Sequence, residues 1–134
     1  MKHTASRHRL QHLRSLAIGS GAAALSLVAG CTMSADQAAV DAYNLSLAEH
    51  LTATGAKMYG AYWCPYCADQ KDLFGNAVDA IPYVECDAAG KDPQPQLCQE
   101  KDIKAYPTWE INGEFYLGAH PLVTLAELSN FESQ

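Results

Sequence analysis

Two cysteines, Cys64 and Cys67, lie where a strand-like segment gives way to a helix-like one, and this junction constrains the fold more than any other feature. A short apolar run at 57–62 precedes them and a helical pattern at 68–74 follows. A thiol at a helix N-terminus faces unpaired backbone N–H groups and the positive end of the helix dipole, which favour the thiolate. The pattern predicts dithiol–disulfide chemistry, with Cys64 attacking and Cys67 resolving. A structural zinc site or a passive disulfide is the alternative interpretation.

The N-terminal segment has the features of an export signal. Four basic side chains lie within residues 1–15, and no acidic residue precedes Asp36. The small and apolar run at 16–29 is shorter than the roughly 18–20 apolar residues that span a bilayer. A basic start, a short apolar run and small residues before a cut are typical of a secretory signal. We therefore expect the chain to act outside the cytoplasm, in a periplasm or an equivalent lumen.

Cys31 follows Val28-Ala29-Gly30, an arrangement that resembles a bacterial lipobox, in which the cysteine after the cut is lipid-modified. This predicts a signal peptide at 1–30, a tether at 31–37 and one small domain at 38–134, held at a membrane by lipid on Cys31. An ordinary signal peptide with an incidental cysteine is the alternative.

The charge of the predicted mature chain excludes some partners. Four of the nine basic side chains would leave with the signal, while all 15 acidic ones would remain, so the formal charge would fall from −6 to about −10. An acidic body of this kind argues against binding to nucleic acid or to anionic lipid.

The number of cysteines fits these assignments. Five is an odd number for an exported chain. With Cys31 assigned to lipid and Cys64 and Cys67 to the redox pair, Cys86 and Cys98 remain. A disulfide is their natural state in an oxidising compartment, and a ring of this size stabilises a fold by about 3 kcal/mol. A four-cysteine zinc site and a second redox-active pair are the alternatives; otherwise no metal or cofactor is expected.

The rest of the domain alternates between helical and extended patterns. Apolar spacing, prolines and glycines predict helices at about 35–52, 64–76, 96–103 and 121–131, and strands at 56–62, 81–87, 108–111 and 114–117. Asn112-Gly113 between the last two strands is a strong hairpin signal. This order predicts an α/β thioredoxin-like fold, a central mixed sheet flanked by helices, with an additional N-terminal helix.

Pro107 supports the same fold because it stands just before a predicted strand, where a central strand would exclude proline. In thioredoxin-like folds a cis-proline occupies this place, faces the active-site sulfurs and leaves the backbone of the preceding residue, here Tyr106, free to pair with substrate. An ordinary trans proline at a strand start is the alternative.

Four phrases of the sequence resemble the thioredoxin-like domain fused to bacterial and plant vitamin K epoxide reductase homologues. They are residues 55–67, 82–87, 93–98 and 103–113, and the resemblance extends over about 55–130. In that family the domain exchanges disulfides with exported proteins, and a membrane-embedded reductase domain reoxidises it with a quinone. The resemblance implies the same redox pair, the cis-proline and an additional disulfide between Cys86 and Cys98.

The residues around the cysteines are predicted to contact substrate. They are Trp63, Pro65, Tyr66, Tyr106 and Pro107. We expect the chain to differ from the fused proteins in lacking their reductase domain and in carrying its own lipid site. It departs from ordinary thioredoxins at Met58, because they carry a buried aspartate there that helps to deprotonate the resolving thiol. Release through Cys67 must therefore use water or another base.

These observations predict an exported thiol–disulfide oxidoreductase. We expect it to donate disulfides to exported cysteine-containing proteins and to be reoxidised by a membrane partner of vitamin K epoxide reductase type. A thiol reductase or isomerase is one alternative, and a non-catalytic, lipid-tethered binding module with structural disulfides is the other.

Overall fold

A computed structural model of the protein describes residues 34–132. The predicted signal peptide and Cys31 lie outside the described residues, so both stay predictions. The elements are α1 (Ala35–Ala53), β1 (Lys57–Gly60), α2 (Pro65–Leu73), the 3₁₀ helix η1 (Gly75–Ala80), β2 (Tyr83–Glu85), α3 (Pro95–Glu100), β3 (Thr108–Ile111), β4 (Glu114–Leu117) and α4 (Leu122–Ser129). Among these helices, none has the length and apolar character needed to cross a membrane.

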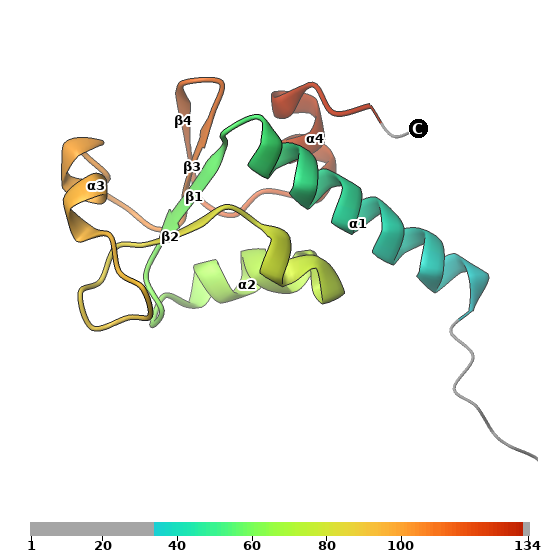
Figure 1. Ribbon diagram of the computed structural model, residues 1–134, viewed down its shortest axis with the longest axis horizontal. Helices are drawn as coiled ribbons and strands as arrows, with labels where there is room; N and C mark the ends of the chain where they lie inside the picture. The colour runs from blue at the N-terminus through green and yellow to red at the C-terminus, as the bar shows by residue number, and fades with distance from the viewer. Residues whose placement is uncertain (1–33, 133–134) are drawn as a thin grey trace, which may run out of the picture. The chain divides into compact units, whose positions relative to one another are not determined.

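The four strands form one mixed sheet in the order β2-β1-β3-β4 (Figure 1). β1 is parallel to β2, and β3 is antiparallel to both β1 and β4. With helices on both faces, the domain has the predicted thioredoxin-like fold. The hairpin strands have the predicted bounds, and Asn112 and Gly113 have φ angles of 53° and 82°, as a two-residue type I′ turn requires.

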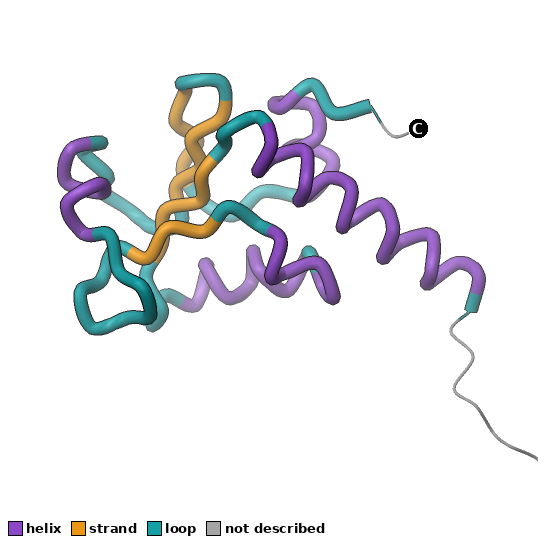
Figure 2. Tube along the Cα trace, in the orientation of Figure 1, coloured by secondary structure: helices purple, strands orange, loops and turns teal. Residues whose placement is uncertain are grey.

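Two buried clusters occupy the two faces of the sheet, because successive side chains of a strand point in opposite directions. The larger contains Met58, Trp109 and Ile111 from the sheet, and α1, α2 and α4 pack on it. The smaller contains Tyr59 and Val84 with the two cysteines that join the end of β2 to α3. Figure 2 shows α3 and its preceding loop apart from the other helices.

The first helix has about the predicted bounds and includes part of the segment predicted as a tether. It begins at Ala35, inside the segment predicted as a tether, and the Ser34 hydroxyl caps it by accepting a hydrogen bond from the Gln37 N–H at 3.2 Å. Val40 is exposed, and the buried side chains of α1 begin only at Asn44. The Asn44 amide donates to the carbonyls at the end of α2, so this helix fixes where the active-site helix ends.

The active-site helix is shorter than predicted. It ends at Leu73 instead of Asn76, and η1 follows at once. Gly75 has φ +54°, a left-handed conformation that interrupts regular α-helix and that glycine adopts without steric cost. The predicted strands at 56–62 and 81–87 are likewise shortened to their paired central residues.

Candidate active site

Cys64 is the N-cap of α2. Its backbone is extended, with φ −78° and ψ 116°, and its Sγ accepts a hydrogen bond from the Cys67 N–H at 3.3 Å. Pro65 occupies the first helical position, where its missing N–H costs nothing. The Cys64 N–H donates to the Ala61 carbonyl at 3.0 Å, which fixes the turn out of β1. The sulfur therefore lies over the helix N-terminus, as the sequence predicts.

The two thiols differ in accessibility. Both are unpaired, but 5% of Cys64 is exposed against 1% of Cys67. Burial, and next the hydrogen bond with Cys64, raises the pKa of the Cys67 thiol to about 12. A buried thiol that stays protonated suits the resolving role and does not suit the attacking one.

Gly60 at the end of β1 gives Cys67 the room it occupies. A Cβ atom at this position would lie 2.8 Å from Cys67 Sγ and 2.8 Å from Cε2 of Tyr83. Any larger residue would push the resolving sulfur or the Tyr83 ring aside. Glycine at the end of the strand is therefore a requirement of this site.

The segment carrying Pro107 approaches the same cluster. The Tyr106–Pro107 peptide bond is cis, Pro107 is fully buried, and the Pro107 carbonyl accepts a hydrogen bond from the Gly118 N–H at 2.8 Å. Tyr106 packs against the cluster that contains both active-site cysteines. The structure thus places Tyr106 against the cluster that contains the redox pair, with the buried Pro107 next to it in the chain.

Exposed aromatic side chains surround Cys64. Trp63 and Tyr66, both predicted to contact substrate, are 58% and 64% exposed, and Tyr62 is 61% exposed. Trp63 is nevertheless fixed: its Nε1–H donates to Asp87 Oδ2 at 2.7 Å, and its ring meets Tyr106 nearly edge-on at 6.2 Å. An aromatic surface held in place beside a reactive sulfur suits contact with an extended peptide.

Asp87 is a site residue that the sequence prediction missed. It follows β2 at the same edge of the sheet at which β1 leads to Cys64, so the two parallel strands deliver it beside Trp63. Hydrogen bonds from the Ala89 N–H and then from Trp63 hold the pKa of its carboxyl below its usual value. The parallel pairing of these strands was the available signal.

Gln70 is the second omission. This fully buried side chain of α2 accepts from the Trp109 Nε1–H at 3.1 Å and from the His120 N–H at 2.7 Å, and its Nε2 donates to the His120 carbonyl at 3.1 Å. It joins the active-site helix to β3 and to the turn before α4. A glutamine one turn after Cys67 gave no sequence signal beyond its helical position.

Met58 is fully buried, so an apolar side chain occupies the place of the aspartate of ordinary thioredoxins. A buried carboxylate nevertheless lies on this face of the sheet, in Glu85, which is paired in register with Gly60. Glu85 Oε2 accepts from the Tyr83 hydroxyl at 3.0 Å, and Oε1 accepts from the Asp87 N–H at 2.9 Å. The sequence prediction assigned no role to Tyr83 or Glu85.

The remaining cysteines form a disulfide. Cys86 and Cys98 are bonded, with their Cα atoms 5.7 Å apart, and they lie in the smaller cluster on the other face from Cys64 and Cys67. A zinc site shared by all four cysteines is therefore excluded. Within residues 34–132, no group of three or more acidic, histidine or cysteine side chains is arranged to hold a metal ion.

No family model matches the chain. The chain is similar to the thiol-disulfide oxidoreductase LTO1 of Arabidopsis thaliana, with 41% identity over 93 residues. The matched region covers 66% of this chain and 25% of that protein, so the chain corresponds to about a quarter of the relative's length. This similarity supports a thioredoxin-like redox domain.

Proposed function

We propose that this protein is an exported thiol–disulfide oxidoreductase whose Cys64–Cys67 pair exchanges disulfides with cysteine-containing proteins. The observation that carries the proposal is the position of Cys64 Sγ at the N-terminus of α2, with the buried Cys67 thiol one turn further on. The similarity to a plant thiol-disulfide oxidoreductase supports the same activity.

The reaction proposed is disulfide donation. A substrate thiolate attacks Cys64 Sγ, the bond between Cys64 and Cys67 breaks, and the Cys67 sulfur leaves and takes up a proton. A second substrate thiolate then attacks the substrate sulfur of the mixed disulfide, and Cys64 leaves as a thiolate. The substrate gains a disulfide, and the pair gains two electrons.

We favour donation over reduction because of the predicted export. A reductant outside the cytoplasm needs electrons carried across the membrane, whereas an oxidant needs only an electron acceptor. Potentials of such pairs run from about −270 mV to about −120 mV, and the groups around the sulfurs set the value.

Each turnover leaves the pair reduced, so a partner must reoxidise it. We propose a separate membrane protein of vitamin K epoxide reductase type, which would pass the electrons to a quinone. Lipid on Cys31 would hold the domain at the membrane surface, where confinement raises the effective concentration of the two partners. The resemblance to the fused family supports this partnership.

The activity is tested by mixing the oxidised protein with a reduced peptide that carries two cysteines. Wild type should convert one equivalent of peptide to its disulfide, and the Cys64→Ser variant should convert none. The Cys86→Ser/Cys98→Ser double variant is the matched control and should keep most of the wild-type conversion. Equal conversion by wild type and Cys64→Ser would contradict the proposal.

The partnership is tested in cells with the Cys67→Ser variant, which should hold its partners as mixed disulfides on Cys64. We expect the membrane reductase among the trapped proteins, and we expect Cys31→Ser to lose both fatty-acid labelling and rapid reoxidation. Trapping of soluble exported proteins alone, with a redox state that does not respond to deletion of the reductase, would exclude the partnership.

A further inference from the structure

In the resolving step the Cys67 thiol must lose its proton, and the side chain of Met58 has no group that can accept it. When Cys67 attacks a mixed disulfide on Cys64, its S–H proton must leave. Because burial raises the pKa of this thiol to about 12, few molecules carry the thiolate at neutral pH. A nearby base would therefore accelerate the step.

Tyr83 and Glu85 lie on the face of the sheet that carries Cys67. The Cβ position above Gly60 is 2.8 Å from Cys67 Sγ and 3.2 Å from the Tyr83 hydroxyl oxygen. The sulfur and the hydroxyl are therefore at most about 6 Å apart, a gap that one water molecule can bridge. The hydroxyl in turn donates to Glu85 Oε2 at 3.0 Å.

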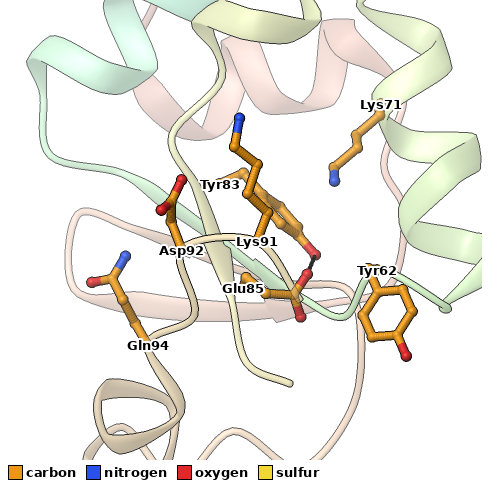
Figure 3. Close-up of a pocket in the computed structure, with 7 residues that line it drawn as sticks. All are labelled: Tyr62, Lys71, Tyr83, Glu85, Lys91, Asp92 and Gln94. Carbon is orange, nitrogen blue, oxygen red and sulfur yellow. Dashed lines mark hydrogen bonds between the residues drawn. The ribbon is translucent and has the colours of Figure 1, made fainter. Parts of the chain in front are cut away.

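The hydrogen-bonded side chains of Tyr83 and Glu85 also border a pocket that is open to solvent. Tyr83 and Glu85 line a pocket of about 390 Å³, and Figure 3 shows the Tyr83 hydroxyl directed at the Glu85 carboxylate within it. Glu85 is 4% exposed, so its carboxylate is shielded and yet borders a solvent-filled space. A proton that reaches the Glu85 carboxylate can therefore pass to solvent in this pocket.

We propose that Tyr83 and Glu85 form the proton route of the resolving cysteine, with Tyr83 as the relay and Glu85 as the acceptor. This inference rests on the disulfide exchange proposed above. It assigns to these two residues of β2 the task that a buried aspartate performs in thioredoxins, although they lie on a different strand from Met58.

The resolving step exchanges one disulfide bond for another and moves one proton. Cys67 Sγ attacks Cys64 Sγ in the mixed disulfide, the bond between Cys64 and the partner sulfur breaks, and the partner leaves as a thiolate. The Cys67 proton passes to the Tyr83 oxygen, directly or through a water molecule, while the Tyr83 proton passes to the Glu85 carboxylate. Glu85 then releases a proton to the pocket, and disulfide donation runs the same route in reverse.

The other charged and titratable groups around Tyr83 do not replace Glu85. They are Lys71 on α2, Tyr62, Lys91 and Asp92 around the pocket, and Cys64, while Asp87 and Tyr106 lie near Glu85. Lys71 lies over the Tyr83 ring, with Nζ 3.4 Å from the centroid, and is a cation. Asp87 already accepts from Trp63 and the Ala89 N–H. Burial and the Glu85 hydrogen bond raise the pKa of Tyr83, which suits a hydroxyl that relays protons without ionising.

The test follows the reduced full-length protein in a stopped-flow instrument after mixing with an aromatic disulfide that releases a coloured thiolate. The first release, by Cys64, depends on reagent concentration; the second, by Cys67, does not. Glu85→Gln, which keeps partners for Tyr83 and the Asp87 N–H, should slow only the second phase, by about 100-fold near pH 6. Tyr83→Phe should act in the same way, and it carries the test if Glu85→Gln does not fold.

The pH profile separates proton transfer from a structural role. In both variants the second rate should rise about tenfold per pH unit, following the Cys67 thiolate, so the deficit should fall below about threefold near pH 9. Wild type should depend much less on pH. Glu110→Gln is the matched control, because Glu110 accepts from the Tyr59 hydroxyl at 2.6 Å and Tyr59 belongs to the cluster on the other face.

The outcomes are distinguishable. Two phases in wild type, with slowed and steeper second phases in Glu85→Gln and Tyr83→Phe, support the route. Two phases in wild type with an unchanged second phase in both variants, or a deficit that is the same at every pH, overturn it and leave the proposed function standing. A wild type that releases no second thiolate overturns both.

Discussion

The two cysteine pairs of this domain are both buried and lie on opposite faces of one sheet, but only one has the geometry for disulfide exchange. Cys64 and Cys67 lie one turn apart at a helix start, beneath exposed aromatic side chains. Cys86 and Cys98 join the end of β2 to α3 across a separation of 12 residues.

Burial alone therefore does not decide the role of a cysteine. In the first pair, one sulfur lies over a helix N-terminus and the other keeps its proton because it is buried. In the second pair, the bond closes a loop whose ends are already tied to the sheet, since the Cys86 N–H donates to the Gly60 carbonyl and the Gln94 N–H to the Glu85 carbonyl. The first geometry favours attack, and the second favours stability.

Substitutions in the two pairs should affect disulfide exchange very differently. Cys64→Ser should abolish disulfide exchange, because the attacking sulfur is gone, while Cys86→Ser/Cys98→Ser should keep most of it. Turnover with a reduced two-cysteine peptide measures both. Substantial loss of activity in the double variant would show that the second pair takes part in electron transfer.

Within the first pair, the two thiols should differ in their response to pH. With Cys64→Ser in place, alkylation of Cys67 near pH 8 should still be much slower than that of a free cysteine, because burial, the largest cause of its raised pKa, remains. Its rate should rise about tenfold per pH unit up to about pH 9, because burial holds the pKa of Cys67 above that of a free thiol and the protonated thiol does not react. Mass spectrometry after timed alkylation measures the rate, and a plateau below pH 9 would contradict the burial argument.

The second pair should matter for stability. Removing it in Cys86→Ser/Cys98→Ser should lower the free energy of unfolding by about 3 kcal/mol, since the unfolded chain loses its constraint. Urea denaturation followed by circular dichroism measures the change. Each single variant leaves one free thiol and serves as a check, and a loss below about 0.5 kcal/mol in the double variant would be inconsistent with a structural role.

The hydrogen bonds of Gln70, which join α2 to β3 and to the turn before α4, should contribute somewhat less to the free energy of unfolding than the disulfide does. Gln70→Met leaves the Trp109 Nε1–H and the His120 N–H without their acceptor, which should cost about 2 kcal/mol. Gln70→Glu keeps an acceptor at the same place and is the comparison variant. The denaturation midpoints of the three proteins measure the effect. Equal stability of wild type and Gln70→Met would contradict a stabilising role for the Gln70 hydrogen bonds.

Asp87 connects the two pairs, because it follows Cys86 and holds Trp63 beside Cys64. Its pKa is below the ordinary value, so its contribution is present above that value and is lost as pH falls through the lowered pKa. The fluorescence of Trp63 should therefore change in acid, below the ordinary range of an aspartate. Asp87→Asn should lack this transition. A transition of the same size in the variant would assign it to other carboxyls.

Signals within short segments of the sequence predicted much of this fold. Where a predicted boundary was wrong, it depends on contacts between residues far apart in the sequence. Asn112-Gly113 gave the hairpin with its bounds, and Cys64 and Cys67 gave the start of the active-site helix. The end of that helix was missed because it depends on Gly75 and on Asn44 from another helix.

The site residues that the prediction missed share one property. Gln70, Glu85 and Asp87 owe their place to partners that are remote in sequence or to strand pairing, such as the register of Glu85 with Gly60. Spacing within one segment does not show such contacts. The assignments of Cys31 and of the export signal lie outside the described residues and stay predictions.

A redox titration read at each cysteine tests whether only the Cys64–Cys67 pair exchanges electrons. The purified protein is equilibrated in glutathione buffers of graded potential, quenched in acid, alkylated, and read cysteine by cysteine by mass spectrometry. We predict that Cys64 and Cys67 are reduced together in one two-electron transition between about −270 mV and about −120 mV, while Cys86 and Cys98 stay bonded throughout. Reduction of Cys86 and Cys98 at the same or a higher potential, or a Cys64–Cys67 pair that never titrates, would contradict the account.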